Sequence, residues 1–260
     1  MGSSWIIVAF ILVLFAVFRY VFPEKNAKYS AEKNINTLSK KYRKFDLVMI
    51  PIAFLFLIGY TAVIGFMLHF ISELRFLVFK QEGIFIKPEF GMWMLPGFFI
   101  GALFYTGTFN KIVDRHWKSD ADEYRAYYNL KYHIGFDWWK ALRWITLGAF
   151  IIGAVIALFM ADSYAYFQKD KLVLNPVFSL GKKEFAYQDL AIIAEVSHFK
   201  APNGNIVFHP HYVLQFQNGF RWSSRWDGFQ GFQSEAQNKQ LIDFLLEKTD
   251  MTLAKYDLME

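Results

Sequence analysis

The chain has 260 residues, of which 55% are hydrophobic and 20% aromatic, and its formal net charge is +5. A soluble domain of this length has about 45–50% apolar residues, so the excess indicates a membrane protein. The absence of cysteine excludes disulfides, thiolate metal sites, Fe–S clusters and a catalytic cysteine. Most Lys and Arg residues flank apolar runs, which favours a role in membrane topology and argues against nucleic acid as a partner.

Four apolar runs are long enough to cross a membrane, which takes about 20 residues. They are Trp5–Phe22, Leu47–Ile71, Met92–Phe109 and Ala141–Met160. No basic residue precedes the first run and no small-residue cleavage site follows it, so we expect an uncleaved anchor. Pro88 and Pro96 leave open that the third run is re-entrant and does not cross.

Positive charge predicts the orientation, because cytoplasmic connections are enriched in Lys and Arg. Fifteen Lys and Arg residues lie in or beside the connections 23–44 and 110–140, against six on the other side. We therefore expect a multi-pass protein of the plasma (inner) membrane with both termini outside the cytoplasm. If one run is re-entrant, the C-terminal domain would face the cytoplasm instead.

Small residues recur at helical spacing within the runs. Gly97 and Gly101 form a G-x-x-x-G pair, and Ala149 and Gly153 form a second small-residue pair. Such pairs let helices approach closely, either within one bundle or in a homo-oligomer. Few polar side chains lie within the runs, so transport is not expected.

The connection 110–140 mixes charges with many Tyr and Trp residues, which predicts amphipathic helices lying at the inner leaflet. His116, Asp120, Asp122 and Glu123 could form the site of a lipid-modifying enzyme. Their spacing matches no recognised ligand or catalytic motif, so a solvated face is the expected interpretation.

The pattern changes after residue 163, which divides the chain into a membrane domain, 1–163, and a soluble domain, 164–260. Short alternating segments separated by turn residues predict antiparallel strands at 171–175, 177–180, 184–187, 191–199, 206–217 and 220–225. Asn218-Gly219 predicts a tight hairpin turn. A capping box at Ser234–Gln237 and an apolar stripe then predict that the domain ends in a helix.

This order of strands and final helix resembles the bacterial PH-like domains that are often attached to membrane spans. The resemblance lies in Asp170–Leu174, Lys183–Ile193, Tyr212–Trp222 and Ser234–Leu246. It implies an antiparallel, partly open barrel closed by one helix, and a binding or scaffolding role. The implied fold class is a bundle of four transmembrane helices with a C-terminal α+β domain. Such domains are often cytoplasmic, whereas the charge distribution places this one outside.

Two features of the soluble domain are candidate sites. His209 and His211 share a strand face, with His198 nearby, but a metal site needs three or four ligands and we expect surface histidines. No metal, cofactor or catalytic residue is therefore predicted. The segment Phe220–Phe232 is dense in aromatic residues and Arg, which are typical anchors of protein interfaces. Its predicted partner-binding residues are Arg221, Trp222, Arg225, Trp226, Phe229 and Phe232, although some of these rings could instead fill the core.

The sequence thus predicts a non-enzymatic membrane protein that presents a PH-like module to a protein or lipid partner. Two alternatives are an immunity or accessory subunit of a membrane complex and a lipid-modifying membrane enzyme. Membrane lipid and a protein are the expected partners, and a homo-oligomer is possible.

Overall fold

The computed structural model describes residues 13–23, 35–77, 83–179, 181–201, 203–224 and 235–258. The chain divides into two compact units. One comprises Met1–Ile64 and Gly97–Ala154, and the other comprises Gly65–Pro96 and Val155–Glu260.

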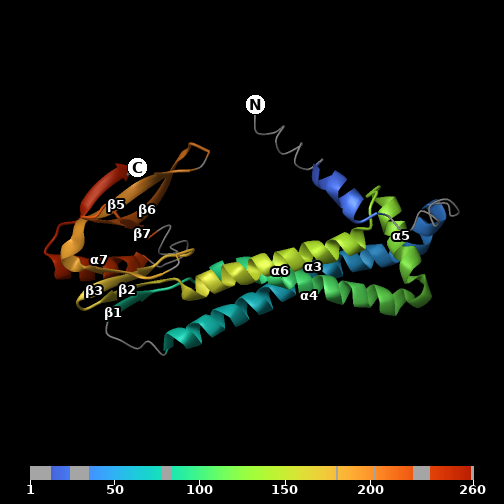
Figure 1. The fold of residues 1–260 in the computed structure, drawn as a ribbon, viewed down its shortest axis with the longest axis horizontal. Helices are drawn as coiled ribbons and strands as arrows, with labels where there is room; N and C mark the ends of the chain where they lie inside the picture. Colours follow the sequence, from blue (N-terminus) through green and yellow to red (C-terminus); the bar gives the residue numbers. More distant parts are fainter. Residues whose placement is uncertain are drawn as a thin grey trace. The chain divides into compact units, whose positions relative to one another are not determined.

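Three long helices carry the apolar runs (Figure 1). They are α3 (Ile35–Leu77), α4 (Phe90–Trp117) and α6 (Trp138–Asp162). The segments Ile35–Leu74, Phe90–Lys131 and Trp138–Asp162 are each long and apolar enough to cross a membrane. Many of their Leu, Ile and Phe side chains are exposed, as expected for residues that face lipid. The described residues therefore have three candidate spans, as in a multi-pass membrane protein.

The predicted count of four spans is not reached in the described part of the chain. The first run, Trp5–Phe22, begins outside the described residues, and only residues 13–21 of it are seen as a helix. Phe18 stacks on Phe136, with ring centroids 5.6 Å apart, and the Phe22 carbonyl accepts a hydrogen bond from the Asp137 N–H. This helix therefore contacts the residues just before α6. Its crossing of the membrane stays a prediction.

The prolines that suggested a re-entrant third run do not interrupt it. Pro88 precedes α4, and Pro96 lies inside the helix, which continues to Trp117. Pro51 similarly lies inside α3. Pro removes one backbone donor from a helix, but a membrane helix tolerates it where neighbouring groups satisfy the freed carbonyl.

Glycine marks the close approach of α3 and α4. A Cβ atom at Gly101 would lie 3.1 Å from the Thr61 backbone nitrogen and 3.2 Å from the Tyr60 carbonyl carbon. Beside it, the Tyr60 and Thr108 hydroxyls are hydrogen-bonded at 2.7 Å. The predicted packing role is therefore confirmed for Gly101, whereas nothing lies within 4 Å of a Cβ at Gly59.

Replacing Gly101 by Leu should lower the thermal stability of the detergent-solubilised protein, because the side chain would collide with the α3 backbone. Overpacking of this kind costs about 1–3 kcal/mol. Gly107→Leu is the matched control, since a Cβ there meets nothing within 4 Å. Equal melting temperatures for the two variants would contradict the close approach.

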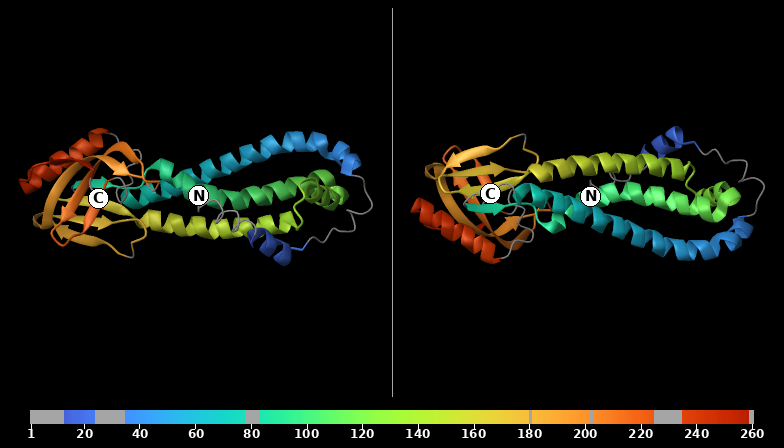
Figure 2. Two further views of the ribbon diagram at one scale, coloured as in Figure 1. Left: turned by 90° about the horizontal axis from the view of Figure 1, so that it is seen from above. Right: turned by 90° about the horizontal axis from the view of Figure 1, so that it is seen from below.

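The strands form two four-stranded sheets (Figures 1 and 2). The first has the order β1-β2-β3-β4 and is antiparallel throughout. Its strands are β1 (Gly83–Ile86), β2 (Tyr164–Gln168), β3 (Lys171–Asn175) and β4 (Lys183–Ala186). The second has the order β7-β6-β5-β8, with β5 (Leu190–Lys200), β6 (Ile206–Phe216), β7 (Arg221–Ser223) and β8 (Ala254–Leu258). The described strands close no barrel, so the barrel part of the predicted fold is not shown.

Three details differ from the predicted domain. Strand β1 comes from the connection between α3 and α4, where no strand was expected. The predicted final helix, α7 (Glu235–Thr249), is followed by β8, which pairs with β5 in parallel. The segment Val177–Ser179 is a turn instead of a strand, since the Ser179 N–H donates to the Pro176 carbonyl and Phe178 has a positive φ. The capping box at Ser234 lies outside the described residues.

The pairing of β1 with β2 constrains the topology. Ile86 pairs with Ala165 and Gly83 with Gln168, while α4 and α6 separate the two strands along the chain. Strands that pair must lie on the same side of a membrane, so an even number of crossings must separate them. The two candidate spans between them, in α4 and α6, satisfy this condition when both cross.

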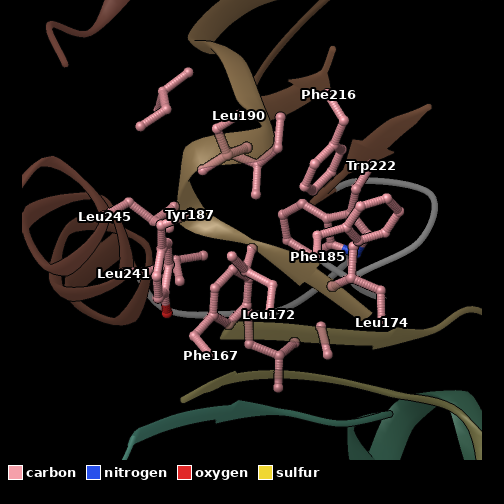
Figure 3. Packing of buried hydrophobic residues seen from close by; sticks show 14 of the residues in the cluster. Phe167, Leu172, Leu174, Phe185, Tyr187, Leu190, Phe216, Trp222, Leu241 and Leu245 are labelled. Atoms are coloured by element: carbon pink, nitrogen blue, oxygen red, sulfur yellow. The ribbon is translucent and has the colours of Figure 1, made fainter. Parts of the chain in front are cut away.

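The core of the two-sheet module lies between both sheets and α7 (Figure 3). Phe167 and Leu172 extend into it from the first sheet, and Leu241 and Leu245 extend from α7. Phe185 stacks on Phe216 with ring centroids 4.0 Å apart. The module is thus one hydrophobic unit to which β1 contributes Ile86.

Tyr187 lies in this core, in the short helix η2 (Tyr187–Asp189), and its hydroxyl donates to the Gln168 carbonyl at 2.6 Å. Burial raises the pKa of this phenol above its ordinary value of 10.0. A group with a raised folded-state pKa contributes stability that is present below the unfolded-state pKa and is lost as pH rises above it. The module should therefore lose stability above about pH 10.

Tyr187→Phe removes this titration. At pH 8 the variant should be less stable than the wild type by about 1 kcal/mol, the usual worth of one hydrogen bond. Between pH 9 and 11 the melting temperature of the wild type should fall more steeply, so that the two curves converge. Parallel curves for the full-length proteins would show that Tyr187 does not titrate as inferred.

Candidate functional site

The structure describes only the first part of the predicted interface segment Phe220–Phe232, and Trp222 in that part is buried. Trp222 on β7 is 1% exposed and packs edge-on against Phe167, with ring centroids 5.7 Å apart. Its neighbour Arg221 is exposed. Arg225, Trp226, Phe229 and Phe232 lie outside the described residues, so their predicted role stays a prediction. Trp222 therefore fills the core, and its replacement would report on stability before it reported on binding.

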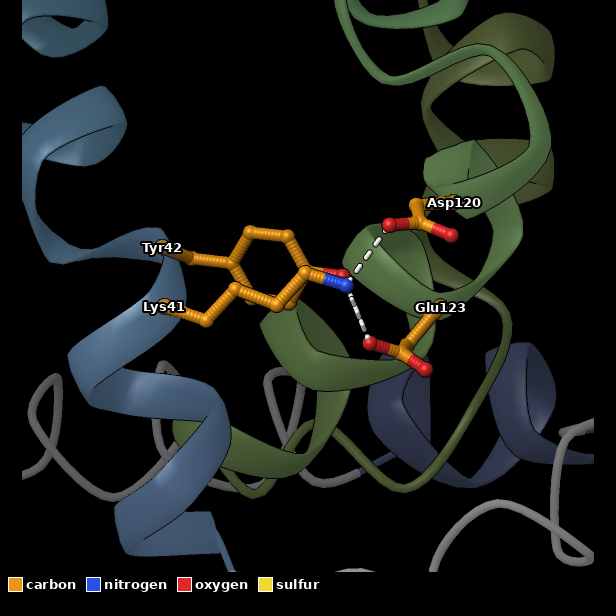
Figure 4. Close-up of polar contacts among 4 residues, drawn as sticks. All are labelled: Lys41, Tyr42, Asp120 and Glu123. Carbon is orange, nitrogen blue, oxygen red and sulfur yellow. Dashed lines mark hydrogen bonds and ion pairs between the residues drawn. The ribbon is translucent and has the colours of Figure 1, made fainter.

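The acidic residues of the connection 110–140 form ion pairs. This connection folds into η1 (Lys118–Asp120) and α5 (Ala121–Lys131). Lys41 Nζ lies 2.7 Å from Asp120 Oδ2 and 2.9 Å from Glu123 Oε1 (Figure 4). The Tyr42 hydroxyl also donates to Glu123, at 2.9 Å. These contacts join the start of α3 to α5.

The other two residues of the suggested enzyme site also have structural partners. Asp122 accepts a hydrogen bond from Arg125, which also pairs with Asp114. The His116 ring stacks on Phe45, with centroids 4.7 Å apart. In the described ranges no three His, Asp or Glu residues are arranged to hold a metal ion. Asp120 and Glu123 therefore share Lys41, whereas Asp122 and His116 contact other partners.

A buried carboxylate lies one turn further along α3. The Asp46 side chain is 7% exposed and accepts hydrogen bonds from the Tyr124 hydroxyl at 3.0 Å, the Tyr127 hydroxyl at 3.4 Å and Lys131 Nζ at 2.7 Å. A buried carboxylate is tolerated only when it is paired and hydrogen-bonded, and these three donors satisfy that requirement. Sequence reasoning missed Asp46, because its partners lie about 80 residues away.

A cavity of about 570 Å³ opens beside Asp46. Residues of α3, α4, α5 and α6 line it, including Tyr105 on α4 and Tyr128 on α5. Its polar groups are a carboxylate, phenols and the indole N–H groups of Trp138 and Trp139. Most of its wall is apolar: Met49, Ile50, Ala53, Phe54, Leu57 and Leu142. The volume lies in the range of small-molecule sites, about 300–1,000 Å³. The arrangement suits an amphipathic molecule with a hydrocarbon part.

The Asp46–Lys131 pair can be tested with two variants. Lys131→Met leaves the carboxylate without its cation, and because Lys131 is 33% exposed the loss should be about 1–3 kcal/mol, below the value for a fully buried pair. Adding Asp46→Asn removes the charge while its amide oxygen still accepts from Tyr124. The double variant should therefore melt at a higher temperature than Lys131→Met. A lower melting temperature would show that the charge itself is not the source of the loss.

The histidines of the two-sheet module contact backbone carbonyls and aromatic rings. His211 Nδ1 is hydrogen-bonded to the His209 carbonyl at 2.9 Å, and His198 Nδ1 lies 3.3 Å from the Asp257 carbonyl. The His209 ring packs edge-on against Phe199. Among the described residues, none of these imidazoles belongs to a group of three side chains that could hold a metal ion.

An exposed apolar patch lies at the tip of the β5–β6 hairpin. Ile206 is 64% exposed, Phe208 is 69% exposed and Val207 between them is 39% exposed. We call these three residues the hairpin patch. Before the patch, the Ala201 N–H donates to the Asn205 carbonyl at 2.8 Å. Ile206 and Phe208 project from one face of β6, and Val207 projects from the other. Exposed apolar side chains gathered at one hairpin tip favour an interaction surface.

The chain therefore combines three helices that are long and apolar enough to cross a membrane with a module of two antiparallel-based sheets and one helix. The apolar helices are those of a multi-pass membrane protein. No protein-family model, no curated protein and no solved structure matches the chain.

Proposed function

We propose that this chain is a non-enzymatic integral membrane protein whose two-sheet module binds a protein partner. The hairpin patch carries the proposal. Fully burying an Ile or Phe side chain contributes about 1.5–3 kcal/mol. Because Ile206 and Phe208 are mostly exposed, a partner that covers them would gain most of that free energy. The patch replaces Trp222 as the surface to test, while Arg221 and the four undescribed residues remain proposed contacts.

The attachment of the module supports a scaffolding role. Only Ser163 separates α6 from β2, and this buried residue donates its hydroxyl to the Met160 carbonyl at 2.9 Å. Asn175 on β3 donates to Asp162 at the end of α6. Since β1 is joined to α3 and α4 as well, the module is fastened to the membrane helices at two places. A bound partner would thus be held at a fixed place near the membrane.

We also propose that the module is a relative of the PH-like domains and lies outside the cytoplasm. The strand order followed by α7 supports the first part. The second part rests on the Lys and Arg residues beside the other ends of α3, α4 and α6. An immunity or accessory subunit would be a special case of the same binding role. The residues suggested for a lipid-modifying enzyme form ion pairs or stack, so they lend that alternative no support.

Photo-cross-linking in the native membrane tests the proposed interface. A benzophenone amino acid in place of Phe208 should yield a discrete protein adduct. The matched control is the same amino acid in place of Phe178, an equally exposed Phe of the module at 65%. Ile206→Ser with Phe208→Ser should abolish the adduct partner's co-purification and leave the melting temperature unchanged, because neither side chain is in the core.

Equal adducts from both positions would indicate non-specific collision. The absence of any protein adduct at position 208 would overturn the proposed interface.

A further inference from the structure

The cavity beside Asp46 has a chemical pattern that the proposed function does not use. Its apolar wall includes Met49, Ala53 and Leu57, which lie on one face of α3 at helical spacing. Ile50 and Phe54, at its rim, are 58% and 64% exposed. All five belong to the candidate span Ile35–Leu74. The cavity therefore opens toward the hydrocarbon of a membrane, and its occupant there must present a hydrocarbon surface.

Two phenol hydroxyls at the polar part of the cavity lack a hydrogen-bond acceptor in the described residues. Tyr105 and Tyr128 both line it, and neither hydroxyl has a hydrogen-bond partner among the residues that the structure describes. The hydrogen bonds that Asp46 accepts come from Tyr124, Tyr127 and Lys131, and neither Tyr105 nor Tyr128 is among its donors in the described residues. A hydroxyl without a partner is unfavourable where water is excluded. The two phenols therefore call for an acceptor oxygen on the occupant.

Charge beside the phenols completes the pattern. Lys131 lies three residues after Tyr128, on the same face of α5, and its ammonium is one-third exposed. An ammonium has three N–H donors, and Asp46 takes one of those on Lys131. A cation at this place favours an anionic group beside the phenols.

We propose that the cavity binds one acyl chain of a membrane glycerophospholipid. The chain lies along the α3 wall, the ester carbonyl oxygens accept hydrogen bonds from Tyr105 and Tyr128, and the phosphate lies near Lys131. This site is separate from the hairpin patch and does not depend on the proposed protein partner.

The test uses the full-length protein reconstituted in vesicles of phosphatidylethanolamine and phosphatidylglycerol. The probe is a phosphatidylglycerol with a diazirine on one acyl chain, and the labelled residues are mapped by mass spectrometry. Labelling should concentrate on the α3 wall, at Met49 to Leu57. Ala53→Trp fills the cavity and should abolish this label, whereas Ile152→Trp, at an exposed position of α6 outside the cavity lining, should leave it intact.

The paired substitution Tyr105→Phe and Tyr128→Phe keeps the shape of the cavity and removes both donors. It should reduce the label about tenfold, the factor that corresponds to about 1.4 kcal/mol. An ether-linked form of the probe, which lacks the carbonyl oxygens, should label the wild type as weakly as the ester probe labels this variant. Unchanged labelling in a folded Ala53→Trp variant would overturn the site. Equal labelling by ester and ether probes would overturn the assignment of the phenols.

Discussion

The pairing of β1 with β2 is the contact on which the organisation of this chain depends. Four residues between two membrane helices form the outer strand of a sheet whose other strands come from the C-terminal part. The backbone hydrogen bonds of this pair join segments about 80 residues apart in sequence. They cover one edge of β2, and they require the chain to leave the membrane on the same side after α3 and after α6. A long unpaired edge would otherwise be open to other chains.

At the other ends of these helices, charge and aromatic rings hold α3 and α5 together. The apolar parts of membrane helices gain little from one another in lipid, because lipid tails are as apolar as their side chains. Specific polar contacts therefore carry more weight in fixing the arrangement. Lys41 between two carboxylates and Asp46 among its three donors provide such contacts. They also leave beside them a cavity with phenols on one part and aliphatic side chains on the other.

The sequence predicted what depends on local pattern. Three of the four apolar runs lie in long helices, and the predicted turn at Asn218-Gly219 has a positive φ of 84° at Gly219. Contacts between distant segments were harder to predict. The run Gly83–Ile86 has too few residues to signal a strand without its partner β2. Likewise Asp46 has no neighbouring motif, and its role follows only from donors on α5.

The same limit applies to the candidate sites. Trp222 was predicted as an interface residue because Trp and Arg cluster near it, but alternation along β7 directs its ring into the core. Ile206 and Phe208 were part of a predicted strand, and pattern alone could not show that this strand extends beyond the core. The four acidic and His residues of the connection 110–140 were predicted as a solvated face. Only the fold brings Lys41 to Asp120 and Glu123, and Phe45 to His116, whereas the Asp122–Arg125 pair is local.

The position of β1 in the chain also has a consequence for biosynthesis. A ribosome makes Gly83–Ile86 well before β2, and α4 and α6 must be synthesised and inserted between the two events. The first sheet can therefore be completed only after α4 and α6 have been synthesised. Insertion of the helices and folding of the module become a single ordered sequence, and a gene fragment that begins at β2 would encode a sheet that lacks its outermost strand.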